Sequence, residues 1–211
     1  MTNISSRTAD AFPALCLSID LEVGKQNNQI HQFAAVRSDN GEAFVFKKGA
    51  LSAALSDLDA FARPAAMLLG HNLIAFDIPR LAAAEPGLRL LKLPLVDTLW
   101  LSPLAFPRNP YHHLIKHYQD GGIRRGSLND PELDARLALE VFSEEVQALK
   151  EADPDLLTAW HWLTTADGAS PGFDSVFASL RKRRRPSDGE AAAAIEALLN
   201  NNACLYHARG L

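Results

Sequence analysis

Residues 14–22 (ALCLSIDLE) begin as an apolar run and end in two acids, Asp20 and Glu22, with one residue between them. The apolar run predicts a strand, and the two-residue period of a strand places both acids on the same face. Neighbouring carboxylates repel each other, and a divalent cation such as Mg²⁺ or Mn²⁺ offsets this repulsion because it prefers hard oxygen ligands. The alternative is a strand that ends in solvent with two surface acids.

The segments that follow predict an α/β fold. Residues 30–37 and 43–47 flank a Ser-Asp-Asn-Gly turn and are expected to form a hairpin beside the first strand. Helices and strands then alternate, at 52–62 (a helix with a serine start), 65–70 (a strand), 73–84 (a helix with Pro79 in its first turn), 96–98 (a strand end), and 98–105, 111–118 and 130–150 (helices). Three antiparallel strands and then parallel strands predict a mixed sheet flanked by helices.

The C-terminal part of the sequence has no strand pattern. Apolar residues recur with helical spacing near 154–164, 173–182 and 188–207. We therefore expect an α/β domain over 1–150 and a helical extension over 151–211. Five consecutive cations at 181–185 predict either a solvated loop or a second phosphate-binding surface.

The composition of the 211-residue chain, 47% hydrophobic and 22% charged, excludes disordered, collagen-like and coiled-coil classes. No apolar run suits a membrane span or a signal peptide, so no membrane partner is expected. Two cysteines cannot build a disulfide framework, so we expect a buried Cys16 and a reducing, cytoplasmic compartment. The net charge of −4 restricts any nucleic-acid surface to a local patch.

Two later motifs add further acids. Residues 70–77 (GHNLIAFD) lead from a buried strand into a helix, with Asp77 in a first turn where the helix dipole favours a carboxylate. Residues 128–139 (LNDPELDARLAL) predict a helix start capped by Asn129 or Asp130. Asp134 then lies among apolar positions, which is an unusual place for a free charge. Each acid taken singly is also explained as a partner of a helix N-terminus.

The order of these motifs resembles a known family. Asp-x-Glu on a first strand, His-Asn-x4-Asp at a strand-to-helix turn and Asp in a late helix resemble the three motifs of the DEDD (DnaQ-like) 3′–5′ exonuclease superfamily. Residues 96–101 (VDTLWL) and 111–118 (YHHLIKHY) are similar to the segments that link those motifs. The resemblance covers about residues 14–150. It implies an RNase H-like fold and hydrolysis of phosphodiester bonds at nucleic-acid 3′ ends, with DNA favoured over RNA.

The resemblance also implies roles for individual residues. Four acids would hold two Mg²⁺ or Mn²⁺ ions for in-line attack of water on the terminal phosphodiester, namely Asp20, which would bridge the ions, Glu22, Asp77 and Asp134. Leu21 and Phe76, beside these acids, are expected either at the terminal nucleotide or in the core. His71 and Asn72 belong to the same motif as Asp77 and are expected at the nucleic acid.

A group of cationic and imidazole side chains lies between the second and third motifs. We expect these residues to contact phosphates near the acids, namely Arg108, His112, His113, Lys116, Arg124 and Arg125.

One position departs from the family pattern. The histidine branch has His, as general base, five residues before its last Asp, and this chain has Asn129 there. The tyrosine branch has Tyr four residues before, and this chain has Asp130. Asparagine cannot accept a proton at neutral pH. The alternatives are that the ions suffice, that Asp130 or a loop histidine substitutes, or that the protein is a catalytically weak or silent nucleic-acid-binding module.

A narrower resemblance concerns partners. Residues 109–113 (NPYHH) and 128–135 (LNDPELDA) resemble the N-terminal nuclease-like region of large RecQ-type helicases. This implies a fused or associated helicase.

Overall fold

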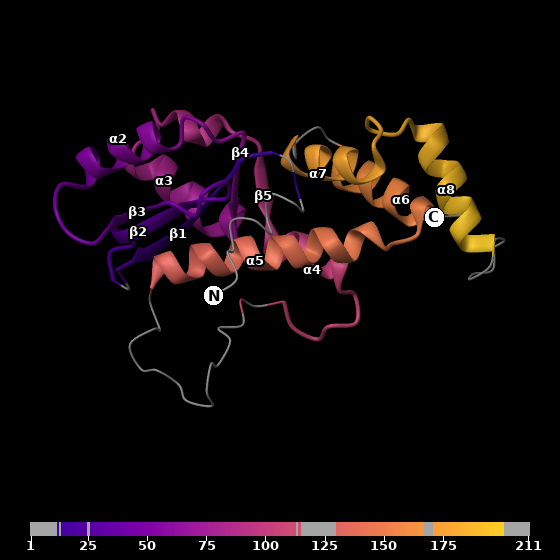
Figure 1. Ribbon diagram of the computed structural model, residues 1–211, viewed down its shortest axis with the longest axis horizontal. Helices are drawn as coiled ribbons and strands as arrows, with labels where there is room; N and C mark the ends of the chain where they lie inside the picture. The colour runs from indigo at the N-terminus through magenta and orange to yellow at the C-terminus, as the bar shows by residue number, and fades with distance from the viewer. Residues whose placement is uncertain are drawn as a thin grey trace. The chain divides into compact units, whose positions relative to one another are not determined.

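The chain divides into two compact units, Met1–Glu145 and Val146–Leu211, in a computed structural model (Figure 1). The structure describes residues 12, 14–24, 26–112, 114, 130–166 and 171–200. Of the helix expected over 111–118, only residues 111, 112 and 114 are described, and they are not helical. The rest of that expected helix lies outside the described residues.

Five strands of the first unit form one sheet in the order β3-β2-β1-β4-β5. Their bounds are β1 (Cys16–Val23), β2 (Ile30–Arg37), β3 (Ala43–Phe46), β4 (Met67–Gly70) and β5 (Leu95–Asp97). The first three strands pair antiparallel, whereas β4 pairs parallel with β1 and β5 pairs parallel with β4. This order and mixture of directions confirm the predicted α/β class with an RNase H-like mixed sheet.

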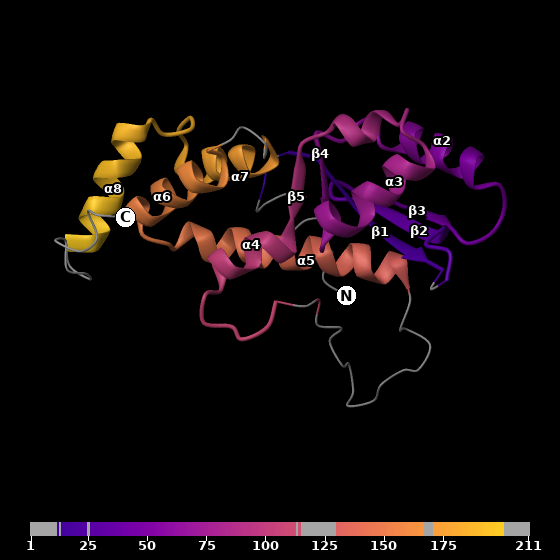
Figure 2. The same ribbon diagram turned by 180° about the vertical axis from the view of Figure 1, so that it is seen from behind.

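Helices cover both faces of the sheet. Figure 1 and Figure 2 show α2 (Leu51–Phe61) and α3 (Ile78–Ala84) on one face and α5 (Pro131–Lys150) along the other. α4 (Thr98–Ala105) follows β5 directly, and its Ser102 lies beside Glu145 of α5.

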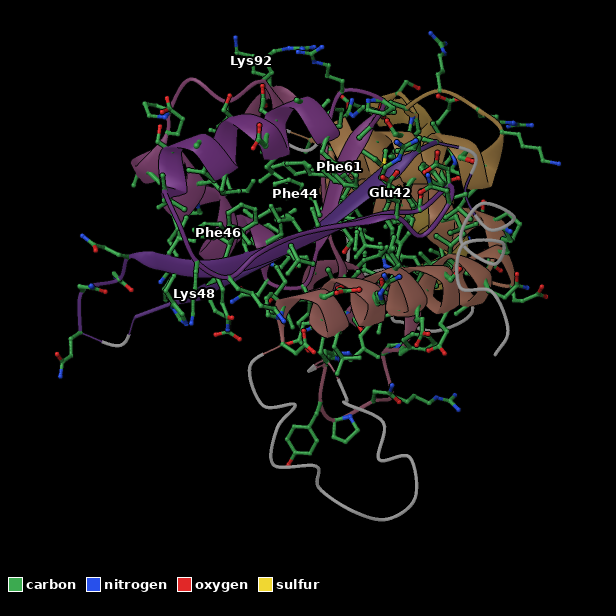
Figure 3. The ribbon with its side chains drawn as sticks, turned by 60° about the vertical axis from the view of Figure 1, so that its left-hand side comes forward. Glu42, Phe44, Phe46, Lys48, Phe61 and Lys92 are labelled. Carbon is green, nitrogen blue, oxygen red and sulfur yellow. The ribbon has the colours of Figure 1, made fainter. Side chains whose placement is uncertain are left out.

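The alternation of β1 supplies the core. Leu17, Ile19 and Leu21 are almost fully buried and pack in one cluster with Leu55 and Leu58 of α2. Burial of each such side chain contributes about 1.5–3 kcal/mol relative to exposure. Phenylalanines complete the layer between α2 and the sheet, where Figure 3 shows Phe44, Phe46 and Phe61.

Residues with special backbone preferences explain where several helices and strands begin or end. Gly41 has a φ of 71° in the turn between β2 and β3, which is the conformation that glycine supplies in the predicted hairpin. Pro79 lies in the first turn of α3, after a π-helical turn, η1 (Leu73–Asp77). The predicted serine start of the first helix is wrong: α2 is capped by Ala50 without a side-chain hydrogen bond. Packing of its buried leucines, rather than a cap, stabilises this helix.

The second unit contains three further helices, α6 (Pro154–Thr164), α7 (Pro171–Arg181) and α8 (Asp188–Asn200). His161 of α6 is fully buried, and its Nδ1 and Nε2 lie 2.9 Å from Arg181 Nη1 and 2.8 Å from Asp174 Oδ1. Arg185 Nε donates to Thr165 Oγ1 at 2.9 Å. The two outer arginines of the 181–185 run are therefore hydrogen-bonded within this unit, whereas residues 182–184 are exposed.

Among the described residues, no helix has the length and apolar character needed to cross a bilayer. Cys16 is fully buried, as predicted, and burial raises the pKa of its thiol to about 12.

Glu145 is the most unusual buried residue of α5. Its side chain is fully buried, and burial raises its pKa to about 9, with Ser102 opposing this shift and the charges of Asp97 and Glu144 adding to it. The folded protein therefore keeps a proton at Glu145 that the unfolded chain releases above a pKa of about 4.5.

Replacement of Glu145 by glutamine tests its raised pKa. Between about pH 5 and pH 9, the Glu145 carboxyl should lower the free energy of unfolding as pH rises, by at most about 1.4 kcal/mol per pH unit. Glu145→Gln should flatten this slope, as measured by urea unfolding at pH 5, 7 and 8.5. Glu151→Gln, which changes an exposed acid that does not contribute to this shift, is the matched control. If the free energy of unfolding depended on pH in the same way in wild type and Glu145→Gln, Glu145 would not be protonated in the folded protein.

Candidate metal centre

Three carboxylates from two distant parts of the chain meet on one face of the sheet. Asp20 and Glu22 come from β1 and Asp134 comes from α5. One carboxylate oxygen from each lies within 4.8 Å of the other two, and all three residues are half-buried. Three like charges this close repel each other, and a cation among them removes that cost. The group can therefore hold a metal ion.

The alternation of β1 explains two of the three ligands. Leu21 lies between the acids and points into the core, where it is only 3% exposed, so Asp20 and Glu22 point to the opposite face. The register of β1 with β2 shifts at Glu22 and Val23, at the end of the strand that carries the acids. Such a bulge redirects the side chains beside it.

The start of α5 positions the third ligand. Asp130 Oδ1 accepts from the backbone N–H groups of Glu132 and Leu133, at 3.2 and 3.4 Å, and so caps the helix as one of the two predicted residues. Arg136 is paired with Glu132 at 2.8 Å and donates to the carbonyl of Gly41 at 3.1 Å. These bonds fix the first turns of α5, which carry Asp134, to the turn between β2 and β3.

Asp77 lies against the same strand but is not a member of this group. It is 2% exposed, and its Oδ1 accepts from the backbone N–H of Leu21 at 3.0 Å. Burial raises the pKa of Asp77 to about 8; the charge of Asp97 adds to this, and the Leu21 N–H and Arg80 oppose it. The structure therefore places Asp77 beside the backbone between the two β1 acids and gives it a positioning contact with β1.

Asp97, the last residue of β5, has a positioning role that the sequence patterns did not indicate. Its carboxylate accepts from the backbone N–H groups of Asn72, Ile74 and Leu99, at 2.8, 2.9 and 3.0 Å. Asn72 has a φ of 64°, so this carboxylate holds a turn in left-handed conformation. The available signal was an acid directly before Thr98 at a predicted strand end, which is typical of a helix N-cap.

The turn after β4 also carries His71. Its Nδ1 lies 2.8 Å from Thr98 Oγ1, which in turn donates to the carbonyl of Gly70 at 3.3 Å. His71 and Asn72 are both half-buried at the carboxyl ends of the parallel strands. Together with Asp97, they form one hydrogen-bonded edge beside η1.

The remaining predicted residues are distributed as follows. Phe76 is half-buried, and the guanidinium of Arg80 lies over its ring at 3.6 Å. Arg108 is exposed, and His112 Nδ1 lies 3.0 Å from Ser102 Oγ. Five other predicted site residues lie outside the described residues, namely His113, Lys116, Arg124, Arg125 and Asn129. The structure brings together three of the four predicted acids. Leu21 points into the core, away from the face of the sheet on which these acids lie.

Comparisons with known proteins add no assignment. A scan against protein-family models gives no match to the chain, and a search of curated proteins gives none either.

Stability in the presence of Mn²⁺ tests the candidate metal centre. A hundredfold excess of Mn²⁺ over its Kd should raise the melting temperature of the wild type by about 5 °C or more, because a ligand of the folded state stabilises it. Glu22→Gln should abolish this rise. In chelator the same variant should be no less stable than wild type, since one of three repelling charges is gone.

The exposed Glu144→Gln is the charge-matched control and should keep the full shift. An equal Mn²⁺ shift in wild type and Glu22→Gln would contradict the assignment of Glu22 as a ligand.

Proposed function

We propose that the protein is a metal-dependent 3′–5′ exonuclease that hydrolyses phosphodiester bonds at the 3′ ends of nucleic acids, with DNA as the favoured substrate. The observation that carries the proposal is the meeting of Asp20 and Glu22 of β1 with Asp134 of α5. The order of the three motifs along the chain supports the same function. The likeness to DEDD exonucleases is part of this proposal.

The donor set suits two ions of Mg²⁺ or Mn²⁺. Asp20, Glu22 and Asp134 offer hard carboxylate oxygens within 4.8 Å of one another. Asp77 is the fourth acid and fixes the backbone between the two β1 ligands through Leu21 N–H. When bound, the divalent ions supply activation of the attacking water and stabilisation of the charge that develops on the phosphate and the leaving 3′ oxygen.

The protein must also provide for the proton of the attacking water. Asn129 cannot accept it. Asp130 already accepts two backbone N–H groups at the start of α5. His112 is therefore a better candidate than Asp130 for the proton acceptor. An imidazole can accept a proton near neutral pH, and the Nδ1 atom of His112 is hydrogen-bonded to Ser102.

A second candidate function follows from Asn129 itself. A nucleic-acid-binding module without catalytic power would keep the fold to dock a 3′ end, for a fused or associated helicase. The acid cluster favours the enzyme, since its three carboxylates can hold the metal ion that phosphodiester hydrolysis would use.

An oligonucleotide assay separates the two functions. With Mg²⁺ or Mn²⁺, the protein should shorten a 5′-labelled DNA strand from its 3′ end and release nucleoside 5′-monophosphates. Asp20→Asn should reduce the rate at least a hundredfold while the fold is retained, because it removes one of the three clustered carboxylates that would hold the metal. Asp57→Asn, an exposed aspartate on α2, should leave the rate unchanged.

The polarity of digestion is part of the same assay. A blocked 3′ terminus should slow the reaction sharply. Cleavage of closed circles, or full activity in Asp20→Asn, would sink the proposed function.

The position of the missing histidine gives a further test. If the proton acceptor limits the rate, Asn129→His should raise kcat, because general-base catalysis contributes roughly 10²–10⁴-fold. The pH–rate profile should then gain a limb near about pH 6.5, where an ordinary histidine titrates. Kinetics with Asp134→Asn in the same background provide the control, and this double variant should be inactive. An unchanged rate in Asn129→His would show that this position does not take part in proton transfer.

A further inference from the structure

The structure contains a second candidate site, at the other end of the parallel strands from the acids. A surface concavity of about 260 Å³ lies between the C-terminal end of α2 and the 3-10 helix η2 (Arg89–Lys92). Three cations line it, namely Arg63, Arg89 and Lys92. We propose that this concavity, the α2–η2 pocket, binds a phosphomonoester group.

The charge of the α2–η2 pocket is unbalanced. Asp59 is the one acid in its lining, and its Oδ1 already accepts from the backbone N–H of Leu90 at 2.8 Å. This bond ties η2 to α2 and shapes the pocket. Within the described part of the chain, Arg63, Arg89 and Lys92 form no ion pair. All three side chains are exposed, so their charged groups are open to an anion bound in this concavity.

The pocket is distinct from the candidate metal centre. Arg63 precedes β4 and Lys92 precedes β5, so both lie at the amino ends of these parallel strands. His71 and Thr98 follow the same strands and lie at their carboxyl ends. Figure 3 shows Lys92 beyond α2, on the side away from α5. A ligand in the α2–η2 pocket therefore has no contact with the acids of β1.

The chemistry of the lining selects the ligand. A phosphomonoester carries about −1.5 to −2 charges at pH 7, which matches three cations and one acid, whereas each internucleotide phosphate carries one charge. Arginine guanidinium groups bind phosphate oxygens in pairs, and lysine adds a point charge. An open concavity of about 260 Å³ has room for a single terminal phosphate with its sugar rather than for an extended strand. The group can come from a free nucleoside 5′-monophosphate or from a phosphorylated strand terminus.

Calorimetric titration of the full chain in chelator and low salt tests the proposal. Adenosine 5′-monophosphate should bind saturably and adenosine should not. The triple variant R63Q/R89Q/K92Q should lose at least tenfold in affinity, and its exposed positions leave the fold intact, as circular dichroism would verify. The triple variant K47Q/K48Q/K150Q removes the same charge from exposed sites elsewhere and should bind as wild type does.

Two oligonucleotide probes distinguish the sources of the phosphate. If the ligand is a strand terminus, a 5′-phosphorylated decanucleotide should bind more tightly than adenosine 5′-monophosphate, and its 5′-hydroxyl form at least tenfold more weakly. If the ligand is a free nucleotide, the monophosphate should bind at least as tightly as the phosphorylated strand. Either result supports a phosphomonoester site.

Absence of saturable monophosphate binding, equal binding of adenosine, or an equal loss in the control triple variant would overturn the proposal. Because chelator is present and binding is the readout, this result is independent of whether the acid cluster is an exonuclease centre.

Discussion

The alternation of β1 is the constraint on which both the core and the candidate metal centre depend. One set of its side chains, Leu17, Ile19 and Leu21, is buried against α2 and the strands. The other set includes Asp20 and Glu22 and faces α5. A slip of one residue in register would move the acids into the core and the leucines out of it. The hydrophobic free energy of this cluster therefore also fixes the direction of the two carboxylates.

Two further carboxylates hold the backbone around the site. Asp77 accepts from Leu21 N–H, and Asp97 accepts from three N–H groups at the turns after β4 and β5. Burial raises the pKa of both acids, although these N–H groups oppose the shift. Buried acids with raised pKa values are costly for stability and concentrate at functional sites. Through these hydrogen bonds, Asp77 and Asp97 fix the backbone of β1 and of the turn after β4 at the carboxyl ends of the strands.

Much of this arrangement could be predicted from local sequence patterns. The first strand, the hairpin at Gly41, the place of Pro79 and the cap before α5 each follow from a rule that acts over a few residues. The contact of Asp77 with Leu21 N–H could not be predicted, because it joins residues far apart in the chain. The role of Asp97 was missed for the same reason: two of its three partners belong to another turn.

The sequence also could not predict which individual side chains are buried. Leu21 was expected either at a nucleotide or in the core, and strand alternation alone could not decide which face α2 would cover. The three cations of the α2–η2 pocket are separated in sequence and show no motif. Only the packing of η2 on α2, through Asp59 and Leu90, brings them together.

Anomalous diffraction from crystals soaked in Mn²⁺ tests the central claim most directly. A manganese peak should lie about 2–2.5 Å from one carboxylate oxygen each of Asp20, Glu22 and Asp134, and it should disappear in crystals of Asp20→Asn. A well-ordered structure in millimolar Mn²⁺ with no peak between β1 and α5, or with its peaks only at other acids, would contradict the assignment of these three residues as a metal centre.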